Sequence, residues 1–213
     1  MSFSIPRIYP ITDTQISGLS HAEQVRRLTD GGSRFIQLRE KSASSEEFYA
    51  YALEALSVAS AVGAMVIIND RVDIALAVGA GGVHLGQDDM PAEKARELLG
   101  ANAVIGVSTH SVEQAINAAR LPVDYIAIGP IFSTSTKEDP DLVVGLEGLR
   151  LVRGAVGAFP LVAIGGISSD NIVSVISHGA DSAAIISDLL RNPEKIAEQY
   201  RKLDQMTSNV KHL

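Results

Sequence analysis

The chain has 213 residues, of which 46% are hydrophobic and 20% are charged. This length and apolar content suit one large globular domain and exclude an intrinsically disordered protein. The net charge of -7 disfavours broad binding to nucleic acid or to anionic membranes, and the absence of cysteine excludes disulfides and thiolate chemistry. No apolar stretch is long enough to cross a bilayer.

Short apolar runs alternate with amphipathic stretches along the whole chain, and most of them end at glycine or polar residues. Such runs are typical of buried strands, and the stretches between them have helical spacing. The predicted strands are residues 7–12, 35–39, 65–68, 82–85, 103–107, 124–128, 160–164 and 182–186. The predicted helices are residues 21–30, 45–61, 72–78, 91–99, 111–119, 146–156, 169–178 and 194–203.

Eight strand–helix units in one undivided chain favour an α/β fold, a single-domain (β/α)8 TIM barrel over residues 1–213. A doubly wound open sheet would give the same alternation, but nearly even spacing of eight units fits a closed barrel better. The tail at 207–213 is expected to be frayed. In either fold, functional residues lie beyond the C-terminal ends of the strands.

The N-terminus does not resemble a signal peptide, so we expect a cytoplasmic protein and leave a homo-oligomer open.

Two acidic residues follow neighbouring predicted strands: Asp70 comes just after 65–68, and Asp89 just after 82–85. A right-handed helical crossover between parallel strands brings both strand ends to the same edge of the sheet. Singly, Asp70 could shape a turn and Asp89 could cap a helix. Together they predict a cation site, and a few carboxylate oxygens beside a phosphate are what Mg²⁺ uses.

Basic and amide side chains follow the second predicted strand. Strand alternation puts Gln37, Arg39 and Lys41 on one face, which at a barrel rim is the functional face. An ordinary ion pair with Glu40 or Asp70 is the alternative interpretation. A rim that carries Arg and Lys favours a phosphate or diphosphate ligand, because the guanidinium fork and the ammonium charge both bind such groups.

A second phosphate-binding pattern follows the seventh and eighth predicted strands. Gly165 and Gly166 precede a predicted helix, where backbone N–H groups can bind phosphate, and Ser187 follows the eighth strand. TIM barrels commonly bind phosphate after these two strands. The long loop after the sixth strand adds hydroxyl groups and a cation at 134–137. No set of nucleophile, base and orienting residue is evident.

Six motifs, taken together, resemble the thiamine-phosphate synthase family over about residues 7–203. They are QLREK at 37–41, INDRVD at 68–73, HLGQDD at 84–89, GVS at 106–108, GPIF and TSTK between 129 and 137, and AIGGI at 163–167. The resemblance implies a (β/α)8 barrel that joins a pyrimidine diphosphate to a thiazole phosphate and releases diphosphate. It also implies a dissociative, Mg²⁺-assisted mechanism without a protein nucleophile.

The resemblance also implies residue roles. The implied ligands of the pyrimidine diphosphate are Gln37, Leu38, Arg39, Glu40, Lys41, Asn69, Ser108 and Lys137. The implied ligands of Mg²⁺ are Asp70 and Asp89, and those of the thiazole phosphate are Thr134, Ser135, Thr136, Gly166, Ile186 and Ser187. The implied catalytic residues are Arg39, Lys41, Ser108 and Lys137, which we expect to act by neutralising charge on the leaving diphosphate.

Two departures from the family pattern and two alternative functions remain. Ser133 stands where relatives usually have proline, and residues 138–141 form an acidic loop. A thiazole tautomerase of the same superfamily would use His110 as its acid/base and would not need Asp89 or Mg²⁺. A sensor would bind phosphorylated ligands without turnover, and nothing in the sequence favours it. We expect small-molecule substrates and no nucleic acid or membrane partner.

Overall fold

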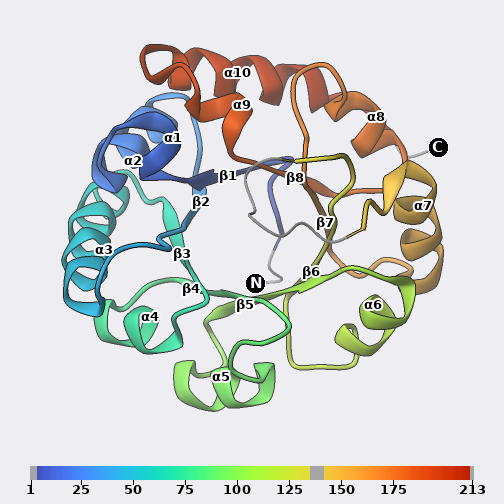
Figure 1. Ribbon diagram of the computed structural model, residues 1–213, viewed down its shortest axis with the longest axis horizontal. Coiled ribbons are helices and arrows are strands. Elements are labelled where there is room, and N and C mark those ends of the chain that lie inside the picture. The colour runs from blue at the N-terminus through green and yellow to red at the C-terminus, as the bar shows by residue number, and fades with distance from the viewer. Residues whose placement is uncertain (1–3, 135–141, 212–213) are drawn as a thin grey trace.

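The computed structural model describes residues 4–134 and 142–211. Eight parallel strands form a closed barrel in the order β1 to β8, with β1 paired to β8 (Figure 1). Their bounds are β1 Ile8–Thr12, β2 Phe35–Leu38, β3 Met65–Asn69, β4 Gly82–Leu85, β5 Val104–Thr109, β6 Tyr125–Ile128, β7 Leu161–Ile164 and β8 Ser182–Ile185. The predicted TIM barrel is therefore confirmed, and the open sheet is excluded.

Helices surround the barrel as an outer ring (Figure 1). Within the described residues they are α1 Thr14–Ser17, α2 His21–Asp30, α3 Ser45–Ser60, α4 Val72–Val78, α5 Ala92–Leu99, α6 Val112–Ala118, α7 Gly145–Val156, α8 Ile172–Ser177, α9 Ser187–Leu190, the 3₁₀ turn η1 Pro193–Lys195 and α10 Ile196–Thr207. None of these helices is long and apolar enough to cross a membrane.

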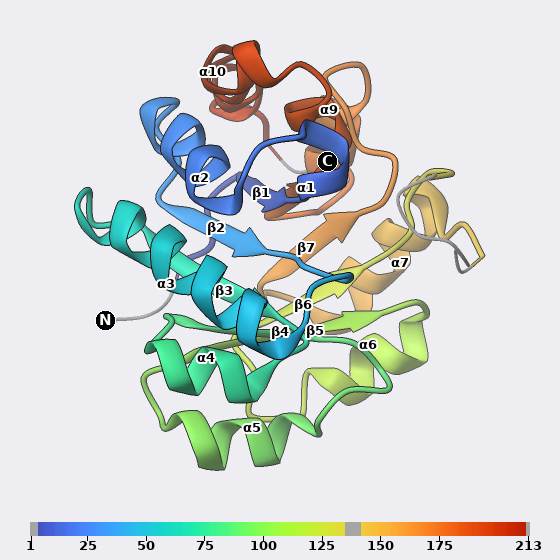
Figure 2. The ribbon, with the colours of Figure 1, turned by 60° about the vertical axis from the view of Figure 1, so that its left-hand side comes forward.

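Strand side chains alternate between two buried layers. The outward layer packs against the helices and is made of aliphatic residues such as Ile36, Ile68 and Ile126. The inward layer fills the barrel and includes Tyr9 and Tyr125. Because every strand is parallel, all eight C-terminal ends point to one side of the barrel (Figure 2). Inward side chains near those ends can therefore meet in one pocket.

The eight strands and eight main helices lie where the sequence predicts them, and the differences are local. The short α1 and α9 were not predicted, because four residues are too few for a helical period. Of the tail expected to be frayed, 207–213, the structure describes residues 207–211. Thr207 ends α10, is fully buried and donates its hydroxyl to Leu203 O, while Val210 O accepts a hydrogen bond from Arg7.

Candidate active site

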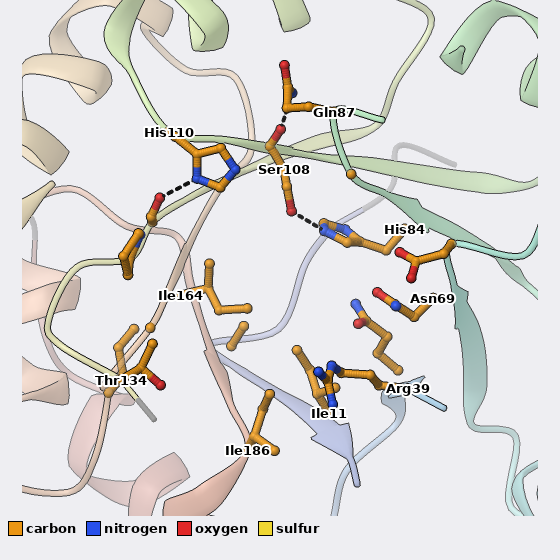
Figure 3. A pocket seen from close by; sticks show the side chains of 18 of the residues that line it. Ile11, Arg39, Asn69, His84, Gln87, Ser108, His110, Thr134, Ile164 and Ile186 are labelled. Atoms are coloured by element: carbon orange, nitrogen blue, oxygen red, sulfur yellow. Dashed lines mark hydrogen bonds between the residues drawn. The ribbon is translucent and has the colours of Figure 1, made fainter. Parts of the chain in front are cut away.

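A pocket of about 620 Å³ opens at the C-terminal ends of the strands (Figure 3). Most of the residues predicted to bind ligands lie on its wall, although they come from segments far apart in the sequence. These are Gln37, Arg39, Lys41, Asn69, Asp70, Asp89, Ser108, Thr134, Gly166, Ile186 and Ser187. The barrel topology brings them together, as expected for residues that follow parallel strands.

Two predicted ligands do not line this pocket. Leu38 is fully buried in the outward aliphatic layer, because it alternates with the inward-facing Gln37. Glu40 accepts hydrogen bonds from the backbone N–H groups of Ser42 and Ala43, and its other oxygen lies 3.3 Å from His21 Nε2. Glu40 therefore shapes the loop after β2. Ser135, Thr136 and Lys137 lie outside the described residues.

The carboxyl groups of Asp70 and Asp89 lie together at the ends of β3 and β4. Lys41 Nζ is 2.5 Å from Asp70 Oδ2, and the backbone N–H of Gly86 donates to Asp89 Oδ2 at 2.6 Å. Asp70 has φ 63°, and it is the one non-glycine residue of the described chain in the left-handed region. Aspartate tolerates that conformation better than most residues do, and here it turns the carboxylate toward Lys41.

This pair of carboxylates fits a cation. Burial raises the pKa of Asp89, the Gly86 N–H lowers it, and the adjacent Asp70 carboxyl group raises it further. Two carboxylates that disfavour each other's charge are stabilised by a positive ion between them. Among the described residues, no cluster of three or more His, Cys, Asp or Glu side chains could enclose a metal. Only an ion that takes most of its ligands from water or substrate, as Mg²⁺ does, would suit two carboxylates.

Arg39 is held at the rim by a side chain that the sequence did not single out. Its Nη1 lies 2.6 Å from Asp13 Oδ2, while Asp13 Oδ1 accepts hydrogen bonds from the first N–H groups of α1. Asp13 is nearly buried, and Arg39 is about 20% exposed. The ion pair uses one nitrogen of the guanidinium group, so the rest of the fork can still bind an anion.

A row of polar side chains crosses the barrel beneath the pocket. Gln37 lies 2.9 Å from Tyr9, Tyr9 lies 2.9 Å from Tyr125, Tyr125 lies 2.9 Å from His84, and His84 lies 2.8 Å from Ser108. Burial lowers the pKa of His84 to about 4, so the imidazole is neutral at neutral pH. His84 lies within a strand, and no local sequence pattern marks it as a site residue. Its inward register, shared with Ser108, was the available signal.

The opposite side of the pocket contains two consecutive glycines. Gly165 and Gly166 follow β7 with φ values of 100° and 64°, and Ser187 begins α9 after β8. A neighbouring hollow of about 250 Å³ continues from Gly166 and Ser187 to Arg191. Because Gly165 and Gly166 have no side chains, an anionic group can approach their backbone closely.

His110 lines the pocket between these two sides. Its Nδ1 lies 2.7 Å from the carbonyl oxygen of Gly129, so Nδ1 carries the proton and donates (Figure 3). This contact orients the His110 ring at the pocket wall, and it does not favour a tautomerase over other functions.

A closed (β/α)8 barrel with a polar pocket at the C-terminal ends of its strands defines a TIM-barrel enzyme. Residues 8–189 match the family model described as thiamine monophosphate synthase, and the chain belongs to this family. It is therefore a transferase. The family comparisons favour the synthase over the tautomerase.

Similar proteins cover almost the whole chain. The thiamine-phosphate synthase of Chloroflexus aurantiacus is 43% identical over 204 residues, which are 94% of each chain. That of Methanoregula boonei is 45% identical over 191 residues, 89% of this chain and 88% of the relative. The solved thiamine phosphate pyrophosphorylase of Pyrococcus furiosus has a TM-score of 0.85 and 37% identity, and the match covers 96% of both chains.

Proposed function

We propose that the chain joins 4-amino-2-methyl-5-hydroxymethylpyrimidine diphosphate to a thiazole phosphate, giving thiamine phosphate and diphosphate. One observation carries this proposal: a single pocket has a charged side, with Arg39, Lys41, Asp70 and Asp89, facing a glycine-rich side at Gly166. Two different phosphorylated substrates can therefore bind next to each other. We propose that the protein works on these small molecules in the cytoplasm.

The charged side supports diphosphate as a leaving group. Arg39 and Lys41 project from the loop after β2 and can neutralise negative charge as the bond to diphosphate breaks. Lys137, outside the described residues, is assigned the same role by its motif. The reaction then needs no protein nucleophile, because the aminopyrimidine stabilises the methylene cation left behind.

Asp70 and Asp89 would hold Mg²⁺, since they are adjacent and disfavour each other's charge. When bound, the ion adds positive charge at the diphosphate oxygens and lowers the barrier to their departure. Lys41, which contacts Asp70, keeps its own charge close to the same oxygens.

The glycine-rich side supports binding of the thiazole phosphate. Gly166, Ile186, Ser187 and Thr134 line that part of the pocket. We assign the phosphate to the backbone around Gly166 and Ser187, which leaves the thiazole ring directed toward the pyrimidine. Binding both substrates in one pocket lets the ring nitrogen attack the methylene cation before water does.

The test is diphosphate release by the purified chain given both substrates, with Mg²⁺ or with excess EDTA. Mg²⁺-dependent release together with formation of thiamine phosphate supports the proposal. Release that persists in EDTA contradicts the metal assignment. Binding of the thiazole phosphate without any release contradicts the synthase function and makes His110→Asn the next variant to study.

A further inference from the structure

The polar row beneath the pocket is continuous from one wall to the other. Gln37, at the end of β2, and Ser108, on β5, both line the pocket, and three side chains connect them through the barrel interior. Figure 3 shows the His84–Ser108 end of this row, which we call the interior chain: Gln37, Tyr9, Tyr125, His84 and Ser108. Tyr9 and Tyr125 are at most 1% exposed, so bulk water cannot replace their partners.

Each hydrogen bond in the interior chain fixes the next. Gln37 Nε2 can only donate, so the Tyr9 oxygen accepts from it and the Tyr9 proton goes to Tyr125. Having accepted from Tyr9, Tyr125 directs its own proton to His84 Nδ1. Nδ1 of the neutral imidazole is then the acceptor, so Nε2 carries the proton and donates to Ser108 Oγ.

We propose that the interior chain is a proton-ordered relay in which Tyr9, Tyr125 and His84 are positioning residues that fix Ser108 as a hydrogen-bond donor to the pocket. The Ser108 hydroxyl oxygen accepts a hydrogen bond from His84 Nε2. The hydroxyl proton of Ser108 is therefore directed to the ligand. At the other end, Gln37 uses an N–H for Tyr9 and offers its carbonyl oxygen to the pocket. The two ends of the interior chain are therefore complementary: Ser108 donates a hydrogen bond to the pocket, and Gln37 accepts one.

The relay also links the two ends. If a ligand turns the Gln37 amide so that its oxygen faces Tyr9, every hydrogen bond in the row reverses and Ser108 becomes an acceptor. A ligand must therefore match both ends at once. An aminopyrimidine carries both a donor amine and acceptor ring nitrogens, so it can present a donor to Gln37 and an acceptor to Ser108. This recognition role rests on the proposed function, whereas the order of protons in the protein does not.

The sequence leaves room for the interior chain. Gly106 lies on β5 opposite Tyr125, and a Cβ atom at this position would come within 2.0 Å of the Tyr125 ring and 2.4 Å of its hydroxyl oxygen. Any other residue at 106 would displace the central hydroxyl of the row. The stacked contact between the Tyr125 and His84 rings, with centroids 5.5 Å apart, also holds the imidazole in position.

The tautomer of His84 tests the proposal in the protein without substrates. The measurement is a long-range ¹H–¹⁵N correlation spectrum of the full chain labelled at its five histidines, with the His84 signals assigned by their loss in His84→Gln. In the wild type we expect the proton on Nε2. In Gln37→Glu, at mildly alkaline pH, the introduced carboxylate can only accept, so we expect the proton to move to Nδ1.

Two control variants separate the relay from general electrostatics. Gln87→Glu adds a carboxylate to the same pocket. Gln87 donates to the backbone oxygen of Ser108 and not to a side chain of the row, so this variant should leave the His84 tautomer unchanged. In a Tyr9→Phe background the row is cut, so adding Gln37→Glu should no longer move the proton. The proposal is overturned by an Nδ1 proton in the wild type, by no change in Gln37→Glu, or by the same change in Gln87→Glu.

Turnover gives a second measurement. Tyr125→Phe removes one oxygen from the middle of the row, and we expect kcat to fall about as far as in Ser108→Ala, with KM for the thiazole phosphate unchanged. Combining the two substitutions should cost little more than either alone, because both remove the same ordered donor. Fully additive losses would contradict the relay. The tautomer result stands whether or not the chain makes thiamine phosphate, so failure of the two proposals can be distinguished.

Discussion

The two sides of the pocket are built in different ways. On the β2–β5 side, the functional groups are side chains, and each is held by another: Arg39 by Asp13, Lys41 by Asp70, and Ser108 by His84. On the β7–β8 side, two glycines expose backbone to the pocket, and a Cβ atom at Gly166 would meet main-chain and Cβ atoms. Ligand binding on the β2–β5 side therefore depends on charge and hydrogen bonding. On the β7–β8 side it depends on the space that the glycines leave.

This difference determines what a substitution should do. On the β2–β5 side, an isosteric change of one atom alters charge without altering shape. We expect it to act on turnover where the group acts on the leaving diphosphate, and on binding where it only holds such a group in place. On the β7–β8 side, one added methyl group alters shape without altering charge, and we expect it to act on binding. The four predictions below compare the sides, beginning with the largest expected effect.

We expect Asp89→Asn to lower kcat by about 10³-fold, because metal-assisted charge neutralisation contributes several kcal/mol to the transition state. Asp70→Asn should act similarly, and asparagine tolerates the φ of 63° at that position. The measurement is the rate of diphosphate release as a function of Mg²⁺ concentration. Glu93→Gln on the exposed face of α5 is the control for loss of one negative charge. Full activity in either Asp variant would show that the pair does not hold the ion.

The buried, neutral His84 beneath the β2–β5 side of the pocket makes the free energy of unfolding depend on pH. An unfolded histidine titrates near its ordinary pKa of 6.5, whereas burial lowers the pKa of His84 to about 4. Between these values the unfolded chain binds the extra proton, so stability is complete above about pH 6.5 and is lost as the pH falls toward 4, by about 3 kcal/mol. Urea unfolding at several pH values measures this loss. The His84→Gln variant should lose correspondingly less unfolding free energy over the same pH range. A loss equal to that of the wild type would contradict burial of a neutral imidazole.

The sequence predicted the barrel because each strand is a short apolar run with a clear end, and eight such runs leave little choice of architecture. It also predicted most of the pocket wall, since Gln37, Asn69 and Ser108 occupy inward register positions near those ends. Leu38 was grouped with the ligands because the motif is contiguous. Alternation along the strand places it in the outward layer instead.

Other features depend on contacts that no local pattern carries. Glu40 contacts His21, which lies on α2 and is held by Thr12 at 2.7 Å from the other ring nitrogen. Tyr9 meets Tyr125 across the interior, and this meeting requires both barrel closure and the glycine at 106. Such partners come from distant strands, so only the assembled structure could identify them.

On the backbone side, we expect Gly166→Ala to raise KM for the thiazole phosphate by about 10- to 100-fold with a smaller change in kcat. A Cβ atom at this position would lie 2.6 Å from Ser133 O and 2.8 Å from Phe132 Cβ, and its φ of 64° is strained for any side chain. An order of magnitude in KM corresponds to about 1.4 kcal/mol of lost binding. The measurement is steady-state kinetics with the thiazole phosphate varied.

Gly154→Ala is the matched control for Gly166→Ala, because Gly154 lies on α7 with open space where its Cβ would be. This control should keep the wild-type KM and should not lower thermal stability, because alanine is favoured over glycine inside a helix. A Gly166→Ala variant that folds and binds the thiazole phosphate normally would show that backbone access at this position is not what the ligand needs.

The smallest expected effect comes from a substitution beside Arg39 on the β2–β5 side. Asp13→Asn removes the charge paired with Arg39, but the remaining side-chain oxygen can still accept from Gln15 and Ile16 and cap α1. Without the ion pair, Arg39 must lose its rotamer freedom when the diphosphate binds, at a cost of about 1 kcal/mol. We expect KM for the pyrimidine diphosphate to rise about fivefold with kcat nearly unchanged. Steady-state kinetics with the pyrimidine diphosphate varied show whether this KM rises or falls. A fall in KM would mean that Asp13 competes with the diphosphate for Arg39, so that this ion pair opposes binding instead of preorganising the side chain.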